Sequence, residues 1–282
     1  MHEHVPHHVP YPTRKLSYAT SYDNTLKATT IRSVEWMTAK LSLMRRLRRF
    51  ERDGRPDGQA FWSKALDIMG IELTTPESVI ARIPKTGPVV LVANHPHGLV
   101  DGMVLAELIG RVREDYKILT RSFLTGVAEI DRFMIPVPFP NEEDALQQNL
   151  IMRKRSMEHL NGGGLVALFP SGVVASSDTA FGPVIERPWN AFTAKMIQRS
   201  NATVVPVFFP GANSRWYQVA NSISATLRQS LLLYEVRHAL DKPQRPMVGP
   251  PITPDLWQPE SDNQTSFMDW LRDQTLALAK EA

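Results

Sequence analysis

Short runs of apolar residues alternate along most of the chain with longer segments in which apolar residues recur every three or four positions. The short runs are rich in β-branched residues and predict buried strands at 88–93, 116–120, 164–169, 203–209 and 245–249. The longer segments predict helices at 101–114, 142–160, 189–200, 216–229 and 263–280. This alternation predicts an α/β fold with a mostly parallel sheet that is flanked by helices.

The segment 28–52 also has helical spacing, and it carries an excess of positive charge. Its apolar face contains Ile31, Val34, Met37, Leu41, Met44 and Leu47, and a second row contains Trp36, Leu43 and Phe50. Residues 1–52 contain ten Lys and Arg against four Asp and Glu, whereas the remainder contains 22 against 25. A basic amphipathic helix with aromatic residues suits the headgroup region of an anionic bilayer. The alternative is a helix that packs on its own domain with a solvated basic rim.

These patterns divide the chain into three regions. They are an irregular N-terminal segment at 1–27, a basic amphipathic helical segment for membrane association at 28–75, and an α/β domain at 76–282. The basic residues do not accompany a nucleic-acid-binding motif, so we expect no nucleic acid partner. We also expect neither a membrane-spanning helix nor a signal peptide, because apolar runs of the required length are missing.

The residue types themselves exclude some chemistry. The sequence contains no cysteine, which excludes a disulfide framework, thiolate metal ligands and a cysteine nucleophile. Histidines are frequent among the first eight residues, but we interpret that stretch as an irregular start, and we expect no metal site.

The strongest candidate chemistry follows the run at 88–93. Asn94, His95, His97 and Asp101 come directly after this predicted strand, in a turn that contains Pro and Gly. A histidine beside a carboxylate acts as a general base when the carboxylate fixes its tautomer and stabilises its charged form. His97 competes with His95 for that role, and Asp101 is alternatively only the cap of the following helix.

Polar groups also follow other predicted strands, where open α/β sheets bind ligands. After the run at 164–169 the candidates are Phe169, Pro170, Ser171 and Gly172, and the backbone N–H groups around Gly172 suit an anion. After the run at 203–209 they are Asn213 and Arg215. Arg132 lies between strand-like segments and suits a phosphate or carboxylate, although a surface ion pair is the simpler interpretation.

In this order, over residues 76–252, the motifs resemble those of the glycerophospholipid acyltransferases. More narrowly, they are similar to the bacterial lyso-ornithine-lipid and hemolysin-like branch. The turn from Asn94 to Asp101 matches a first block of Asn-His-x4-Asp with one extra residue. The stretches 130–132, 169–172 and 205–207 resemble the second, third and fourth blocks, and Ser171 stands where Glu is usual. The runs 213–215 and 227–236 are also typical of the branch.

The resemblance implies transfer of a fatty acyl group from acyl-CoA or acyl carrier protein to a lysolipid hydroxyl, with lyso-ornithine lipid and lysophosphatidic acid as candidate acceptors. It implies His95 as the base, Asp101 as its orienting partner and Arg132 as the ligand of the acceptor's anionic group. The thioester is a co-substrate, and no other cofactor is expected. We further expect a cytoplasmic protein that is peripheral on the inner face of an anionic membrane. The rival interpretations are a lipid ester or thioester hydrolase and a non-catalytic lipid-binding protein.

Overall fold

The structure is a computed structural model that describes residue 17, residue 19 and residues 24–120, 127–138 and 144–281. The predicted irregular segment 1–27, with its histidines, falls almost entirely outside the described residues. Within the described part of the chain, no helix is long and apolar enough to cross a membrane.

The centre of the fold is a sheet with the strand order β3-β2-β4-β1-β5-β6. Its strands are β1 (Val89–Ala93), β2 (Tyr116–Thr120), β3 (Met134–Pro136), β4 (Leu165–Leu168), β5 (Thr203–Phe208) and β6 (Met247–Val248). Neighbouring strands are parallel except β6, which runs antiparallel to β5 at one edge. The predicted, mostly parallel α/β sheet is therefore confirmed, although the three-residue strand β3 was not predicted.

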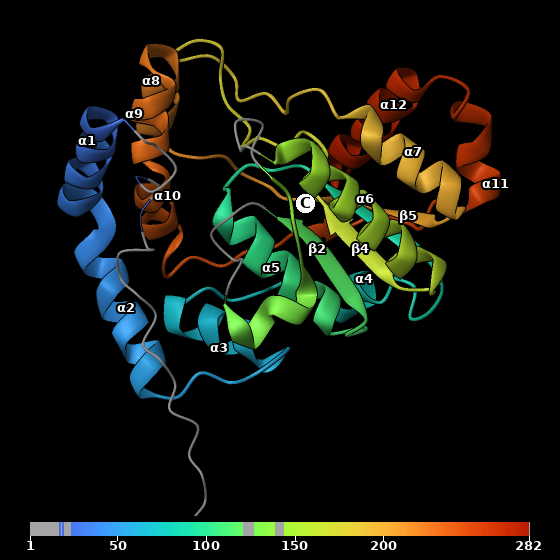
Figure 1. Cartoon of the computed structure of the whole chain (residues 1–282), viewed down its shortest axis with the longest axis horizontal. Coiled ribbons are helices and arrows are strands. Elements are labelled where there is room, and N and C mark those ends of the chain that lie inside the picture. The colour runs from blue at the N-terminus through green and yellow to red at the C-terminus, as the bar shows by residue number, and fades with distance from the viewer. Residues whose placement is uncertain (1–16, 18, 20–23, 121–126, 139–143, 282) are drawn as a thin grey trace, which may run out of the picture.

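Helices cover both faces of the sheet, which gives three layers (Figure 1). Because side chains alternate along a strand, Val89 and Leu91 pack on one face of the sheet while Val90 and Val92 pack on the other. The first face is covered by α3 (Ala60–Met69), α5 (Leu99–Gly110) and α10 (Leu232–Ala239). The second is covered by α6 (Ala145–Asn161), α7 (Ala191–Ser200) and α12 (Gln264–Ala277).

The remaining helices lie toward the ends of these layers. They are α4 (Glu77–Ile80), α8 (Arg215–Ile223), α9 (Ala225–Ser230) and α11 (Pro254–Trp257). The helix predicted at 216–229 is thus two helices, because Ser224 has an extended backbone between them. Its hydroxyl accepts the N–H groups of Thr226 and Leu227 and so begins α9. The helix α10 that follows was not predicted as an element.

The predicted N-terminal helix is present and runs along the outside of the domain (Figure 1). It consists of α1 (Thr25–Glu35), a π-helical segment (Trp36–Lys40) and α2 (Leu41–Arg52). It packs on α9, α10 and α3. A π turn contains one residue more than an α turn, so it changes which residues face the domain.

The predicted apolar face of this helix was therefore only partly right. Ile31 is buried as expected, but Met37 and Leu41 are 76% and 48% exposed. Beyond the π segment, Leu43 and Phe50 from the second row pack on the domain instead.

Candidate active site

The turn between β1 and α5 brings two histidines to one carboxylate. β1 ends at Ala93 and α5 begins at Leu99, so residues 94–98 form a short loop at the carboxyl end of the central strand. Gly98 has a φ of +75°, a conformation that other residues rarely adopt, and this lets the chain reverse tightly into the helix. Asp101 then points from the first turn of α5 back into the loop.

Asp101 is completely buried and accepts hydrogen bonds from several sides. Its Oδ2 lies 3.0 Å from His95 Nδ1, and its Oδ1 lies 3.0 Å from His97 Nδ1. The backbone N–H groups of His97 and Gly98 also donate to Oδ2, at 2.8 and 3.1 Å. Both histidines thus share one carboxylate, whereas the sequence left open which of them meets it.

These contacts set the charge of the group. Burial favours the neutral acid, but attraction to His97 and the hydrogen bonds from both histidines outweigh it and lower the pKa of Asp101 to about 2. For His97, burial disfavours the charged ring, but the Asp101 carboxylate outweighs this effect and raises the pKa of His97 above its usual value. Asp101 is therefore an anion at neutral pH, with an imidazole on each side.

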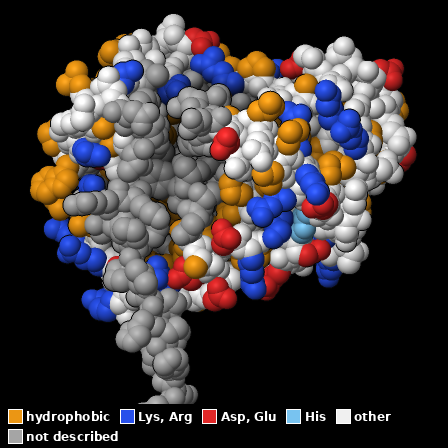
Figure 2. Space-filling model, viewed as in Figure 1, with side chains coloured by type: hydrophobic (Ala, Val, Ile, Leu, Met, Phe, Trp, Pro, Cys, Tyr) orange, Lys and Arg blue, Asp and Glu red, His pale blue; other side chains and the backbone are white. Residues whose placement is uncertain are grey.

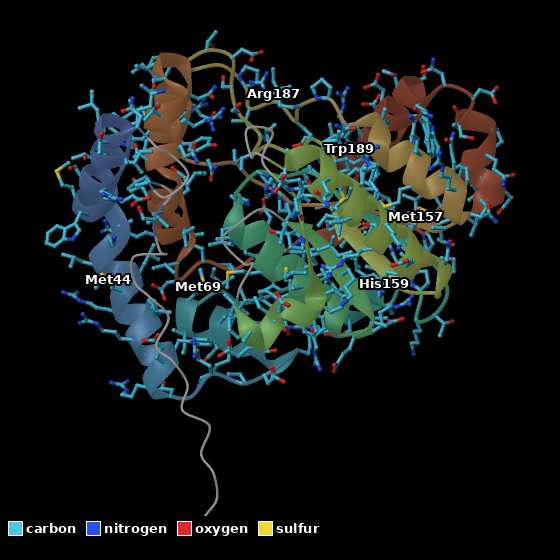
Figure 3. All side chains as sticks on the ribbon, viewed as in Figure 1. Met44, Met69, Met157, His159, Arg187 and Trp189 are labelled. Atoms are coloured by element: carbon cyan, nitrogen blue, oxygen red, sulfur yellow. The ribbon has the colours of Figure 1, made fainter. Side chains whose placement is uncertain are left out.

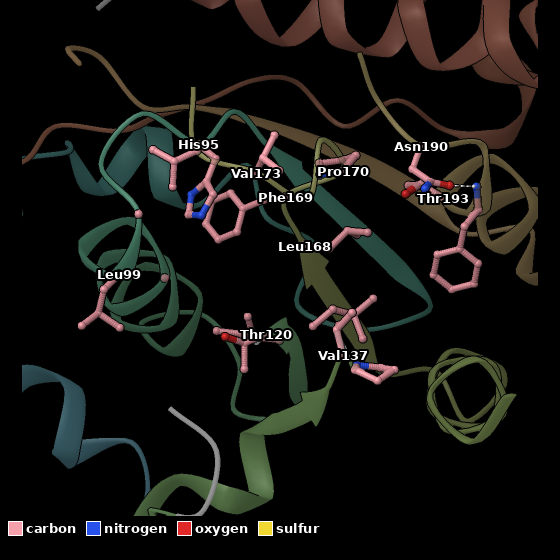
Figure 4. A pocket seen from close by; sticks show the side chains of 18 of the residues that line it. His95, Leu99, Thr120, Val137, Leu168, Phe169, Pro170, Val173, Asn190 and Thr193 are labelled. Atoms are coloured by element: carbon pink, nitrogen blue, oxygen red, sulfur yellow. Dashed lines mark hydrogen bonds between the residues drawn. The ribbon is translucent and has the colours of Figure 1, made fainter. Parts of the chain in front are cut away.

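His95 is held so that its free nitrogen is available to a ligand. With Nδ1 directed at Asp101, the proton on that nitrogen leaves Nε2 as the basic atom of the neutral ring. The ring stacks on Phe169, with centroids 4.0 Å apart and planes at 20° (Figure 4). The side chain of His95 remains 17% exposed and lines a cavity. This geometry suits a general base that acts on a group bound in the cavity.

The cavity lies at the carboxyl ends of the strands and has a volume of about 540 Å³ (Figure 4). Leu99, Val137, Leu168 and Leu232 provide much of its apolar wall. Its polar groups include His95, Thr120, Asn149, Arg153, Asn190, Thr193, Tyr217, Arg228 and Gln229. A largely apolar cavity with a few polar groups fits an amphiphilic ligand.

The other residues of the predicted site fall into two groups, and the first lies close to His95. Phe169, Pro170 and Gly172 line the cavity beside it. The Ser171 hydroxyl donates to the carbonyl of Val173, at 2.9 Å. Gly172 has a φ of +66°, and its N–H donates to the carbonyl of Phe169. That N–H is therefore occupied by the turn rather than directed at a substrate.

Asn94 joins the ends of two strands instead of lining the cavity. Its Nδ2 donates to the carbonyl of Phe209, at 2.9 Å, and its Oδ1 accepts the N–H of Phe209, at 2.7 Å. His97 also lies outside the cavity lining, behind Asp101, with Gly211 close to its Nε2. The structure thus gives both residues contacts with protein where the sequence predicted contacts with substrate.

Asn213, Arg215 and Arg132 are not among the residues that line the cavity. Asn213 is buried, and its carbonyl accepts the Gln218 side chain. Arg215 begins α8 and donates to the carbonyl of Gly182. Neither residue lines this cavity, and the substrate-binding roles predicted for Asn213 and Arg215 stay predictions.

Arg132 lies apart from the cavity. It lies in a 3₁₀ helix, Ala128–Phe133, that leads into β3 and therefore sits at the amino end of that strand. Its guanidinium lies 3.6 Å from Glu114, just before β2, and over the ring of Phe133. The strands β1 to β4 are parallel, and His95 follows the carboxyl end of β1. The amino end of β3, and Arg132 with it, therefore lies at the opposite end of the strands from His95.

Three residues that the sequence did not single out belong near the site. Arg153 comes from α6 and lies over the ring of Phe192, and Arg228 comes from α9 and donates to Asn221 at 2.8 Å. Both arginines line the cavity. Glu186 accepts the backbone N–H of His95, at 3.1 Å. No motif marks Arg153 or Glu186, whereas Arg228 lies within the run 227–236 that is typical of the branch.

A histidine and a carboxylate at the carboxyl ends of parallel strands, beside a largely apolar cavity, are typical of an α/β enzyme with acid–base chemistry. The sequence model of a family described as "Acyltransferase" matches residues 59–236. This match covers more than half of the chain, so the chain belongs to this family of acyltransferases and is an enzyme of that class.

The fold is also similar to that of a solved structure, the 1-acyl-sn-glycerophosphate (LPA) acyltransferase PlsC from Thermotoga maritima. The TM-score is 0.51 and the sequence identity is 11%, over 93% of this chain and 85% of that one. At this identity the likeness concerns the fold. No protein with a curated function matches the sequence.

Proposed function

We propose that this acyltransferase moves a fatty acyl group from an acyl thioester, carried by CoA or acyl carrier protein, to a hydroxyl group of a lysolipid. The observation that carries the proposal is the His95–Asp101 pair, whose imidazole lines an apolar cavity at the strand ends. Membership in the acyltransferase family and the likeness to a lysophosphatidic acid acyltransferase support it.

The proposed chemistry proceeds in two proton transfers through one histidine. His95 Nε2 takes the proton of the lysolipid hydroxyl while its oxygen attacks the thioester carbonyl, and Asp101 stabilises the resulting imidazolium. The tetrahedral oxyanion then collapses, the carbon–sulfur bond breaks, and the thiolate takes the proton from His95. The products are an ester and a free thiol, and no acyl-enzyme forms.

The acceptor's anionic group is best matched by the cavity's own cations. Arg153 and Arg228 both line the cavity that contains His95, whereas Arg132 does not. A guanidinium in a partly desolvated wall makes charge-assisted hydrogen bonds to a phosphate or carboxylate. The two arginines therefore replace Arg132 as the proposed acceptor ligands.

We also propose that the N-terminal helix rests on an anionic membrane. Leu26, Trp36, Met37 and Leu41 are between 48% and 77% exposed. Arg32 lies exposed among them in the sequence, and the exposed Arg45 follows one turn after Leu41. Figure 2 shows hydrophobic and basic side chains next to one another along the side where α1 and α2 run. Exposed apolar residues with interspersed basic residues favour insertion at the headgroup level of anionic lipid.

The experiment that tests the activity is thiol release from acyl-CoA and acyl carrier protein thioesters, with and without lyso-ornithine lipid and lysophosphatidic acid. Release by the wild type that depends on one lysolipid, and disappears in His95→Ala, supports the transferase. The exposed His238 provides the matched control, because His238→Ala removes a histidine on α10 at the surface. Release without an acceptor indicates the hydrolase instead, and the absence of release with every donor indicates a substrate outside this panel.

The experiment that tests the membrane proposal is flotation with vesicles of phosphatidylglycerol or phosphatidylcholine. The double variant Trp36→Ala, Met37→Ala should lose binding to the anionic vesicles. Leu256→Ala, which removes an exposed leucine on α11, should retain it. Equal binding by both variants would rule out this surface.

A further inference from the structure

Glu186 is a buried carboxylate that the chemistry proposed above does not use. It precedes Arg187 and Trp189 on the segment that leads into α7 (Figure 3). Arg187 donates to Asp178 at the surface, whereas Trp189 packs among the apolar residues of the second sheet face. The Glu186 side chain turns inward with Trp189, and the residue is only 8% exposed. Its burial raises the pKa of its carboxyl group.

Both oxygens of this carboxylate are used, and one of them holds the backbone of His95. Oε2 accepts the His95 N–H, at 3.1 Å, and Oε1 accepts the indole N–H of Trp189, at 3.0 Å. The carbonyl of His95 accepts the N–H of Ala175, at 2.8 Å. The backbone groups of His95 are therefore fixed from both sides, independently of the bond between its ring and Asp101.

The same segment also holds the turn that stacks on His95. The N–H of Asn190 donates to the carbonyl of Pro170, at 3.0 Å. The Ser171 side chain, in the same turn, partly offsets the burial that raises the pKa of the Glu186 carboxyl group. Phe169, which stacks on the His95 ring, directly precedes Pro170. Glu186 therefore holds the backbone of His95, and Asn190 holds the turn that begins with its stacking partner. Errors in placement near 1 Å at a reacting group reduce rates by about 100-fold.

We propose that Glu186 is a positioning residue, whose carboxylate fixes the backbone of His95 beside the 169–172 turn at the edge of the cavity. This inference rests on the proposed acyl transfer, in which His95 is the base. Glu186 does not line the cavity, so it acts through the His95 backbone and not on the substrate. The geometry requires two acceptor oxygens, because each oxygen meets a different N–H donor.

The proposal is tested first with Glu186→Gln, which changes one acceptor oxygen into an NH₂ donor. The amide then satisfies only one of the two N–H groups. We expect kcat to fall roughly 10- to 100-fold with little change in the KM for lysolipid. Trp189→Phe is the matched control, because it removes the other partner and leaves the carboxylate on His95. It should retain most of kcat, and a wild-type kcat in Glu186→Gln would overturn the proposal.

A variant that supplies the carboxylate from residue 171 distinguishes positioning of His95 from a general effect on folding stability. Ser171 is near enough to Glu186 to lower the pKa of its carboxyl group, so a glutamate side chain built from residue 171 enters the same space. The double variant Ser171→Glu, Glu186→Gln should therefore recover most of the lost kcat. If it recovers none while its melting temperature equals that of Glu186→Gln, the carboxylate does not position His95 and the proposal is wrong.

A third measurement needs no turnover, so it separates this inference from the proposed activity. The His95 amide proton should exchange slowly in the wild type and in Trp189→Phe, because Glu186 accepts it. It should exchange at least about tenfold faster in Glu186→Gln than in the wild type. Equal exchange in all three proteins refutes the positioning role, whereas a wild type without acyl transfer refutes only the proposed function.

Discussion

Asp101→Asn tests the site most directly, since it keeps the size of the side chain and removes its charge. The two oxygens of Asp101 accept hydrogen bonds from two backbone N–H groups and lie 3.0 Å from the Nδ1 atoms of two histidines. An asparagine offers one acceptor oxygen and one NH₂ group, so at least one ring nitrogen then faces a donor and must lose its own proton to accept it. The amide also leaves His95 without the anion that fixes its tautomer.

The magnitude follows from the pKa of the carboxyl group. A decrease from the usual 3.8 to about 2 corresponds to about 2 kcal/mol of folding stability at neutral pH. In a chain of this size, that loss lowers the melting temperature by about 4–8 °C. Because the folded-state pKa is depressed, the same contribution is present above pH 3.8 in the wild type and is lost as the pH falls to about 2.

Catalysis should suffer much more than stability. In a serine protease, the matching change of the aspartate in a His–Asp pair lowers kcat by about 10⁴-fold through the wrong tautomer. We expect a decrease in kcat of roughly 10³- to 10⁴-fold here, with the protein still folded at assay temperature.

The assay is thiol release with the acceptor identified for the wild type, combined with thermal unfolding of each variant. Asp262→Asn, at an exposed position before α12, is the control for removing one negative charge. A folded Asp101→Asn protein that keeps more than about a tenth of the wild-type kcat would refute the His95–Asp101 mechanism.

Three further outcomes are expected. Asn94→Ala leaves the buried N–H and carbonyl of Phe209 without their partner. The free energy of unfolding in urea should therefore fall by about 2–4 kcal/mol, and an unchanged midpoint would contradict the role of Asn94 in joining the ends of β1 and β5. Arg228→Ala should raise the KM for an anionic lysolipid about tenfold, whereas Arg132→Ala should leave it unchanged; the reverse result would restore Arg132 as the acceptor ligand. Because the pKa of His97 is raised on folding, its contribution to folding stability is complete below pH 6.5 and is lost as the pH rises through the folded-state pKa. The urea midpoint of the wild type should therefore decline over that pH range, and that of His97→Gln should not.

The sequence was sufficient to predict the strand, turn and helix around His95. An uninterrupted apolar run predicts a buried strand, and the Pro and Gly that follow predict its end. The hydrogen bond from His95 to Asp101 agrees with that prediction, because a loop of five residues leaves both side chains at the same strand end. The sharing of Asp101 with His97 depends on loop geometry, which residue spacing does not determine.

The sequence did not place Arg132 relative to the sheet, because it did not predict β3. A strand of three residues gives too short an apolar run to recognise. Without β3, the sequence does not indicate whether the 3₁₀ helix before it lies at the amino or the carboxyl end of the strands. Arg153 was overlooked because an exposed helical arginine has the ordinary pattern of a solvated face. The position of Arg228 depends on the break between α8 and α9 at Ser224, whose hydroxyl binds backbone N–H groups and so starts a new helix.

The position of β1 in the middle of the sheet has a consequence for synthesis of the protein. Its two neighbours, β4 and β5, both emerge from the ribosome much later than β1 itself. Until they emerge, β1 has apolar side chains and two unpaired backbone edges, and such a strand is prone to pair with other chains. The Asn94 side chain likewise waits for Phe209 before it can fix the histidine loop. A nascent chain that stops before β5 therefore contains His95 and Asp101 but needs protection from aggregation, and it becomes an enzyme only after the fifth strand is made.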